Sequence, residues 1–417
     1  MSASTPTIVA IDAMMVLDSR GIPTVRAWVR LSDGTLAVAS APSGKSTGKA
    51  EKAELRDAGR PFGGRGVGVA VEKIRGPIAG CLAGHSIADP AAIDRTLVDL
   101  DGSDDRSNLG ANAMVAVSMA VWRAAAASRR QPLWKALTQP GARANPIPLF
   151  NVINGGAHAS GGLRLQEFML VPHGFKTAAE RIRCGAEIYA ELRNCFSEAG
   201  MSTTVGDEGG FVFTHGGVRS AIALLRRAIE RAEYGVGEQV SLAIDAAANS
   251  FRDAEGIYSP EPGLSLTTEQ MCSWWTDLVD NEPIVMLEDP LDEDDPGGWR
   301  LLTHALGSRV ILVGDDIFVT DAVKIKRAVR DGLANAALLK VNQIGTVSET
   351  IDAWREAKAG SYQTVVSHRS GETCDSFISD LATGIGSEYI KSGAPARSER
   401  VEKYNRLLEI EREMEDT

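Results

Sequence analysis

Short, mostly apolar runs alternate with longer amphipathic stretches over the C-terminal two thirds of the chain. The runs cover residues 240–244, 284–287, 310–313, 336–339, 363–366 and 388–390. Parallel strands that are buried on both faces have this pattern, without regular polar alternation. Six or more strand–helix units over about 270 residues predict a (β/α) barrel.

The first part of the chain has a different pattern. Residues 23–30 and 35–40 are β-rich, and Ser32-Asp33-Gly34 between them is a hairpin signal. Helical patterns follow at residues 67–82, 91–98 and 110–127. Asp89-Pro90 precedes the second of these helices as an N-cap and a first-turn proline.

The boundary between the two patterns has the composition of a linker. Residues 139–143 read QPGAR, which favours a turn or loop. We therefore predict an α/β protein with two domains. Residues 1–138 form a small N-terminal α+β capping domain, and residues 139–417 form the catalytic barrel domain.

Composition limits the environment and the partners of the protein. Lys and Arg total 44 and Asp and Glu total 55, so the net charge is −11 and a nucleic-acid partner is not expected. Five scattered cysteines without a CxxC pair indicate reduced thiols in a cytoplasmic protein. The longest apolar stretch, at residues 111–127, is interrupted by polar residues, and no signal peptide is evident, so no membrane association is expected.

Charged or polar residues stand at the ends of the predicted strands. In chain order they are Asp245, Glu288, Asp315, Lys340, His368-Arg369-Ser370 and Lys391. In a barrel these ends share the C-terminal face, where active sites lie. One acid after a strand is as readily a helix N-cap, but six successive strands are hard to explain in that way. Three converging carboxylates would repel one another without a cation, and oxygen ligands favour a hard ion such as Mg²⁺.

Longer motifs then connect the chain with a known family. They are DSRGIPTV (18–25), PSGKSTG (42–48), ELRD (54–57), NGGAHA (154–159), LQEFM (165–169), VGDEGGF (205–211), AIDAAANSF (243–251), LEDPLDEDD (287–295), VGDDIFVT (313–320), LLKVNQIGT (338–346), SHRSGET (367–373) and KSGAPARSERVEKYNRLL (391–408). On these segments the chain resembles the enolase family from about residue 17 to residue 411. The resemblance implies that a (β/α)8 barrel follows the small N-terminal domain. The small domain would carry the mobile substrate loop.

The resemblance also implies an activity and a set of site residues. The reaction would be the loss of water from 2-phosphoglycerate, giving phosphoenolpyruvate, with two Mg²⁺ ions per active site. Asp245, Glu288 and Asp315 would hold the first ion, and Ser46 would help to hold the second. The catalytic residues would be Lys340 as the general base, Glu208 with Glu167 as the general acid, and His158; the substrate-binding residues would be Arg369, Ser370, Lys391, Gln166 and His368. A homodimer or a higher homo-oligomer is implied as well.

These residue types suit the chemistry. A proton next to a carboxylate is weakly acidic, because its removal adds charge to a group that is already anionic. Divalent cations on that carboxylate neutralise the developing charge. With the cations and Lys391 close by, the pKa of Lys340 should fall, so that the amine can act as a neutral base.

The chain departs from the family pattern near the substrate loops. Lys45 stands where the family usually has alanine, just before Ser46, and VFTH at residues 212–215 replaces the usual continuation after GDEGGF. An alternative is therefore an enolase-like carboxyphosphonoenolpyruvate synthase of phosphonate biosynthesis, which would join a phosphonoformate unit to the same enolate. Lys45 and His215 would suit that second anionic substrate. A catalytically silent relative would lack the base, the acid or a metal ligand, and all of these are present.

Overall fold

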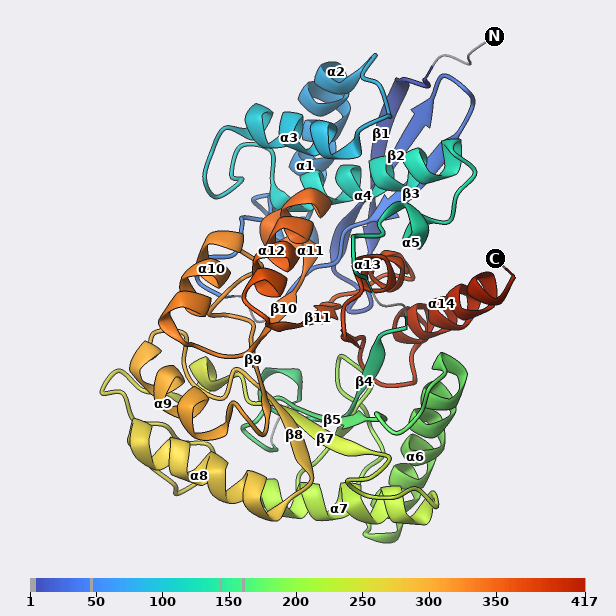
Figure 1. The fold of residues 1–417 in the computed structure, drawn as a ribbon. Coiled ribbons are helices and arrows are strands. Elements are labelled where there is room, and N and C mark those ends of the chain that lie inside the picture. Colours follow the sequence, from blue (N-terminus) through green and yellow to red (C-terminus); the bar gives the residue numbers. More distant parts are fainter. Residues whose placement is uncertain (1–4, 46–47, 143–144, 160–161, 417) are drawn as a thin grey trace.

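The computed structural model describes residues 5–45, 48–142, 145–159 and 162–416 (Figure 1). The predicted metal ligand Ser46 lies outside the described residues. The chain begins with an antiparallel sheet of three strands in the order β1-β2-β3: β1 (Ile8–Leu17), β2 (Pro23–Leu31) and β3 (Leu36–Ser40). Strands β2 and β3 pair from Arg30↔Leu36 to Arg26↔Ser40, which confirms the predicted hairpin.

Helices cover one side of this sheet. They are α1 (Gly68–Lys73), α2 (Ala79–Leu82), α3 (Pro90–Asp101), α4 (Ala111–Ser128) and α5 (Leu133–Ala136). A π-helical turn joins α1 to α2 around Pro77, so the helix predicted at residues 67–82 is present with an irregular centre. Asp89 accepts a hydrogen bond from the backbone of α3, as predicted from its sequence position. The small side chains of α4 let this helix pack closely against β2 and β3.

The second part of the chain is a closed barrel. Its strands are β4 (Ile147–Asn154), β5 (Glu167–Val171), β7 (Ser241–Asp245), β8 (Ile284–Glu288), β9 (Ile311–Gly314), β10 (Ala336–Leu339), β11 (Gln363–Ser367) and β12 (Tyr389–Lys391). Strand β12 pairs with β4 and closes the ring, and the short β6 (Phe211–Val212) adds to β4 outside it. The fold is therefore α/β, with a small sheet domain followed by an eight-stranded barrel, as predicted.

One barrel strand differs from the predicted parallel arrangement. Strand β5 is antiparallel to both of its neighbours, β4 and β7. A parallel pair needs a long crossover, usually a helix, whereas β4 and β5 are joined by residues 155–166, in which the longest described helix is η3 (Gly156–His158). The short connection returns the chain in the opposite direction.

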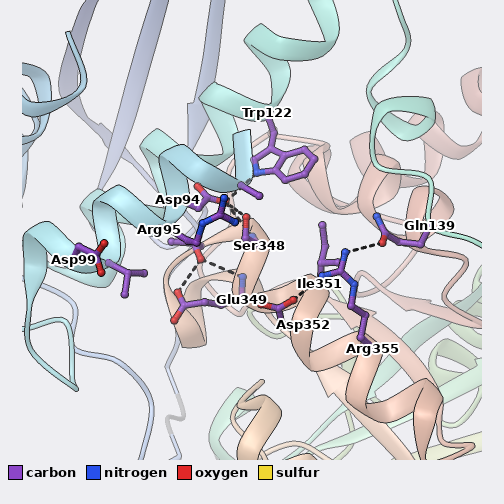
Figure 2. Close-up of a pocket in the computed structure, with 13 residues that line it drawn as sticks. Asp94, Arg95, Asp99, Trp122, Gln139, Ser348, Glu349, Ile351, Asp352 and Arg355 are labelled. Carbon is purple, nitrogen blue, oxygen red and sulfur yellow. Dashed lines mark hydrogen bonds and ion pairs between the residues drawn. The ribbon is translucent and has the colours of Figure 1, made fainter. Parts of the chain in front are cut away.

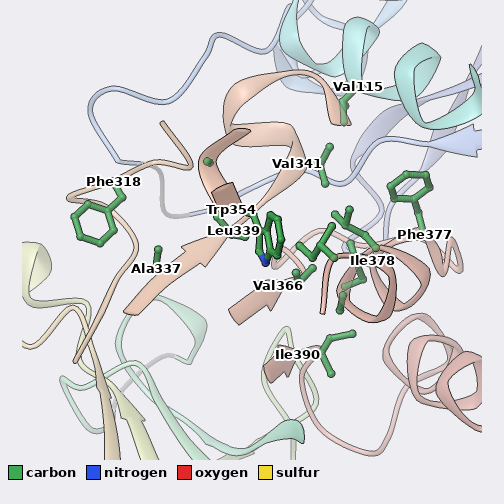
Figure 3. Packing of buried hydrophobic residues seen from close by; sticks show 14 of the residues in the cluster. Val115, Phe318, Ala337, Leu339, Val341, Trp354, Val366, Phe377, Ile378 and Ile390 are labelled. Atoms are coloured by element: carbon green, nitrogen blue, oxygen red, sulfur yellow. The ribbon is translucent and has the colours of Figure 1, made fainter. Parts of the chain in front are cut away.

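Helices surround the barrel: α6 (Ala178–Glu198), α7 (Val218–Arg231), α8 (Thr268–Asn281), α9 (Pro296–Leu306), α10 (Ala322–Asp331), α11 (Val341–Ile344), α12 (Val347–Ala359), α13 (Phe377–Ile385) and α14 (Ser398–Glu415). Apolar side chains fill the space between strands and helices (Figure 3). There Leu339 and Val366 of the barrel share one buried cluster with Trp354 of α12 and Phe377 of α13. Val115 of α4 belongs to the same cluster, so the core continues into the N-terminal part.

Polar contacts also join the two parts. Asp94 of α3 accepts hydrogen bonds from Trp122 Nε1 at 3.0 Å and from Ser348 Oγ of α12 at 2.6 Å, beside a cavity of about 290 Å³ (Figure 2). Arg123 of α4 donates twice to the carboxylate of Asp375, each time at 2.7 Å. These contacts hold the small domain above the barrel. No helix in the described part of the chain is long and apolar enough to cross a membrane.

Candidate active site

The strand ends gather the predicted charged residues at one edge of the barrel. Asp245 and Glu288 are the last residues of β7 and β8 and are register partners. Glu167 is the first residue of β5, and because β5 runs in the opposite direction it pairs with Asp245 at the same edge. Gln166 precedes it and donates to Asp245 Oδ2 at 3.1 Å. Lys391 ends β12 at the corresponding level.

The ammonium group of Lys391 lies among three carboxylates. Its Nζ is 3.0 Å from Glu167 Oε2, 3.2 Å from Asp245 Oδ2 and 2.8 Å from Glu288 Oε2, and all four residues are buried. Burial favours the neutral amine, but the carboxylates outweigh it and raise the pKa of Lys391 well above its ordinary value. The pKa of Glu288 is raised to about 8 by burial and by the charge of Asp245. One ammonium group thus contacts three buried carboxylates.

Lys340, which follows β10, is paired with Asp315. Its Nζ is 2.5 Å from Asp315 Oδ2, while Gln343 Nε2 donates to Asp315 Oδ1 at 2.9 Å. Burial lowers the pKa of Lys340, but the charge of Asp315 outweighs burial and the pKa is raised. We expected this pKa to fall, so the direction is opposite to the expectation. A neutral Lys340 requires that a cation take up the charge of Asp315.

Glu208 lies between two buried histidines. Its Oε1 is 3.6 Å from His158 Nδ1, and its Oε2 is 3.3 Å from His368 Nε2. Asn151 of β4 donates to the same Oε2 at 3.0 Å. His158 Nδ1 is also 3.4 Å from Glu167 Oε1, so this imidazole lies between the two predicted acids.

The two acids have opposite pKa shifts. Burial and the charge of Glu208 raise the pKa of Glu167 well above its ordinary value. Burial also acts to raise the pKa of Glu208, but the neighbouring His158 and His368 outweigh it and hold that pKa well below its ordinary value. Burial lowers the pKa of His368 to about 3, which favours the neutral imidazole. A proton shared by the two acids therefore resides on Glu167.

The predicted anion-binding residues border the same acids. Ser370 Oγ is 3.0 Å from His158 Nε2. Arg369 donates through Nη1 to Glu51 Oε2 at 2.9 Å and through Nη2 to Glu51 Oε1 at 3.1 Å. This guanidinium thus presents two parallel N–H groups to a carboxylate, which is also the geometry that binds a phosphate.

A cavity of about 20 Å³ lies within this group of side chains. It is lined by His158, Gln166, Glu167, Glu208, Asp245, Lys340, Ser367, His368, Arg369, Ser370 and Lys391. Glu288 and Asp315 adjoin it through their ion pairs with the two lysines. The structure therefore brings together nearly all of the predicted catalytic and substrate-binding residues.

Lys45 lies outside that small cavity. It borders a wider one of about 490 Å³, together with Arg20 and Arg56. Its Nζ is 2.8 Å from Asp207 Oδ2, and the two side chains are 43% and 31% exposed. Lys45 is therefore a partly solvated residue whose charge is matched by a carboxylate of the chain itself. His215 is exposed and contacts Thr214 through its Nδ1 at 3.0 Å.

Two described groups have ligand atoms that all lie within 4.8 Å of one another, as a metal site requires. They are His158, Glu167 and Glu208, and Asp289, Asp315 and Asp316. The predicted trio of Asp245, Glu288 and Asp315 is not among them, and lysine ammonium groups contact all three of its carboxylates. The donors nevertheless suit a hard cation, because they are buried carboxylate oxygens.

Several residues that hold the site together were missed by the sequence analysis. Asn151 donates to Glu208, Glu51 holds Arg369, and Arg400 contacts His368. Asn151 was detectable, because it is a polar residue in the otherwise apolar run of β4. Glu51 and Arg400 had no such signal, since charged residues are ordinary in a loop and in a charged helix.

Comparisons with known proteins cover nearly the whole chain. Residues 8–137 match the family described as "Enolase, N-terminal domain". Residues 142–417 match the family described as "Enolase, C-terminal TIM barrel domain". The chain is also 48% identical over 411 residues to a protein named "Enolase" from Mycobacteroides abscessus, and the match covers 99% of this chain and 95% of that relative.

Proposed function

Because the chain belongs to the enolase family and has the hydro-lyase activity of an enolase, we propose that the buried lysine–carboxylate cluster converts 2-phosphoglycerate to phosphoenolpyruvate. The observation that supports this most directly is that Lys340, which pairs with Asp315, lines the same cavity as Glu167 and Glu208. The proposed base, Lys340, and the two proposed acids thus border the same small cavity. The small-molecule substrate would bind there.

The metal site belongs to the same proposal. Asp245, Glu288 and Asp315 would hold Mg²⁺, and Ser46 would contribute to a second ion. The support is the donor set, which consists of buried carboxylates, the oxygen ligands that a hard cation prefers. When bound, such ions would stabilise the extra charge that develops on the substrate carboxylate.

The side chains would divide the proton transfers. Lys340 would take the proton next to the substrate carboxylate. Glu167 and Glu208 would supply a proton to the leaving hydroxyl, and the raised pKa of Glu167 supports it as the member that holds this proton. His158, between the two acids, would orient them.

The remaining residues would bind and orient the substrate. Arg369 offers two parallel donors that would pair with a phosphate, and Ser370 and Lys391 lie beside it in the cavity lining. His368 and Gln166 would add hydrogen bonds at the pocket wall. Because the acids and lysines are already paired with one another, the substrate anions would replace part of these contacts on binding.

The comparisons do not favour the alternative carboxyphosphonoenolpyruvate synthase activity. That alternative was based on Lys45, whose positive charge would bind a second anionic substrate. In the structure Asp207 lies 2.8 Å from its ammonium group, so its charge already has a partner. Lys45→Ala should therefore change the turnover of 2-phosphoglycerate by less than about fivefold, because a partly exposed ion pair is worth about 1 kcal/mol or less.

We also propose a homodimer or a higher homo-oligomer in the cytoplasm. Strand β1 is at the edge of its sheet, and Val9, Met14, Met15 and Leu17 on it are exposed. An apolar edge strand is a common pairing surface. The five cysteines are free, which agrees with a reducing compartment.

Phosphorus NMR tests the proposed activity. The protein is incubated with 2-phosphoglycerate and Mg²⁺, with and without phosphonoformate. We expect phosphoenolpyruvate in both mixtures, no new product that carries the phosphorus of phosphonoformate, and loss of turnover in Lys340→Ala. Turnover that persists in Lys340→Ala would contradict the base assignment, and a phosphonate-containing product would restore the alternative activity.

A further inference from the structure

Arg400, near the start of α14, is a buried arginine that binds the site without contacting the cavity. Its Nη1 donates to His368 Nδ1 at 2.7 Å and to the carbonyl of Arg369 at 2.6 Å. Its Nη2 donates to the carbonyls of Ser370 at 2.5 Å and Asp207 at 3.2 Å. Its side chain is 0% exposed. A charged side chain that is fully buried must be held by such polar contacts, and here they connect Arg400 with residues of the site.

The contact with the imidazole determines where the His368 proton lies. A guanidinium has five N–H donors and no acceptor. At 2.7 Å from Arg400, His368 Nδ1 must therefore be the acceptor and cannot carry a proton. A neutral imidazole has one N–H, which must then be at Nε2, and a doubly protonated ring would face the arginine with a second donor.

The other ring nitrogen faces the acid. His368 Nε2 is 3.3 Å from Glu208 Oε2 and makes no hydrogen bond of normal geometry with any described residue. Asn151 donates to the same oxygen, and a proton on His368 Nε2 would place a second N–H group next to it. Two donors stabilise the ionised form of a carboxylate, which agrees with the lowered pKa of Glu208.

We propose that Arg400 is a positioning residue that fixes His368 as the neutral Nε2–H tautomer, so that His368 serves Glu208 and the substrate as a hydrogen-bond donor and does not act as a base. This inference rests on the proposed function for the role of Glu208. The tautomer of His368 can be measured without any turnover. A failure of the proposed function and a failure of the proposed tautomer can therefore be told apart.

Nitrogen-15 NMR of the histidine side chains tests the tautomer in the wild-type protein. The chain has six histidines, and the His368 signals are identified by their loss in His368→Gln. We expect the shift of an unprotonated nitrogen at Nδ1 and that of a protonated nitrogen at Nε2 near neutral pH. A protonated Nδ1, alone or together with Nε2, would overturn the proposal whatever the activity of the protein.

Variants then distinguish a role of Arg400 in positioning His368 from a purely structural role in supporting the loops. Arg400→Met should move part of the His368 proton to Nδ1 and lower kcat by about tenfold or more, with a smaller change in KM. Arg400→Lys keeps a cationic donor and should recover part of both effects. Arg406→Met is the control, because Arg406 lies in the same helix and pairs with Asp380, away from the site.

The result for Arg400→Met decides between the two roles. A fall in kcat with an unchanged His368 tautomer would assign Arg400 a structural role only and refute the positioning role. If Arg400→Met does not fold, Arg400→Lys and the wild-type tautomer still decide the question. If the wild-type protein fails to convert 2-phosphoglycerate, the proposed function falls, while the tautomer measurement still stands or fails on its own.

Discussion

Replacing Gly44 by alanine should damage the site while leaving the fold intact. A Cβ at this position would lie 1.9 Å from Arg369 Nη2 and 2.6 Å from Arg369 Cζ. Ordinary contact begins at 3.4 Å, so either the backbone of Gly44 or the guanidinium must move by about 1.5 Å. Because Glu51 holds that guanidinium through two hydrogen bonds of 2.9 and 3.1 Å, such a shift breaks at least one of them.

The expected loss follows from that displacement. Losing one hydrogen bond between charged groups costs about 1.5–3 kcal/mol, and 1.4 kcal/mol corresponds to a factor of ten. We therefore expect kcat/KM for 2-phosphoglycerate to fall by roughly 10- to 100-fold, because the guanidinium that would bind the phosphate is displaced. Steady-state formation of phosphoenolpyruvate measures kcat/KM. In the control Gly80→Ala, the new Cβ meets nothing within 4 Å. A Gly44→Ala enzyme within twofold of wild type would refute the packing argument.

Three further predictions concern the metal, the proton transfers and the contact between the two parts of the chain. Chelation should abolish activity and Mg²⁺ should restore it, and Asp315→Asn should lower the Mg²⁺ affinity measured by calorimetry, since an amide lacks the charge; undiminished turnover in excess chelator would contradict this. Lys340→Ala should stop exchange of the substrate α-proton with solvent, whereas Glu208→Gln should block product formation and retain some exchange; equal and complete loss in both would contradict the assigned roles. Asp375→Asn should lower the free energy of unfolding by about 2–4 kcal/mol, because it leaves Arg123 without its carboxylate. Burial tends to raise the pKa of Asp375, but Arg123 outweighs burial and the pKa is lowered. The difference between Asp375→Asn and wild type in urea unfolding should therefore persist at neutral pH and shrink as the pH falls through that lowered pKa. A difference that grows on acidification would contradict this prediction.

The hydrophobic pattern predicted much of the barrel, because its signal is local. The six apolar runs from residue 240 onward correspond to β7–β12. Each of these strands is buried, so its sequence needs little polar alternation. The pattern did not separate β4 and β5, since β4 carries polar residues such as Asn151 that face the site.

The reversed direction of β5 explains why strand ends alone could not locate every acid. The rule that active residues follow the carboxyl ends of strands identified Asp245 and Glu288. Glu167 is at the amino end of its strand, and it reaches the same edge because β5 is antiparallel to β7. Its place in the site was expected from the resemblance to a family, and the connection that reverses the strand could not be read from periodicity.

The pairing of charges was the least predictable part of the site. The sequence shows that acids and lysines follow the strands, but it does not show which lysine contacts which acid. In the structure Lys391 contacts Glu288 at 2.8 Å, and Lys340 contacts Asp315 at 2.5 Å. Each pairing changes the pKa of both partners, because an ammonium group and a carboxylate in contact favour each other's ionised forms. The direction of the Lys340 pKa therefore depended on one ion pair, and only the three-dimensional arrangement could supply it.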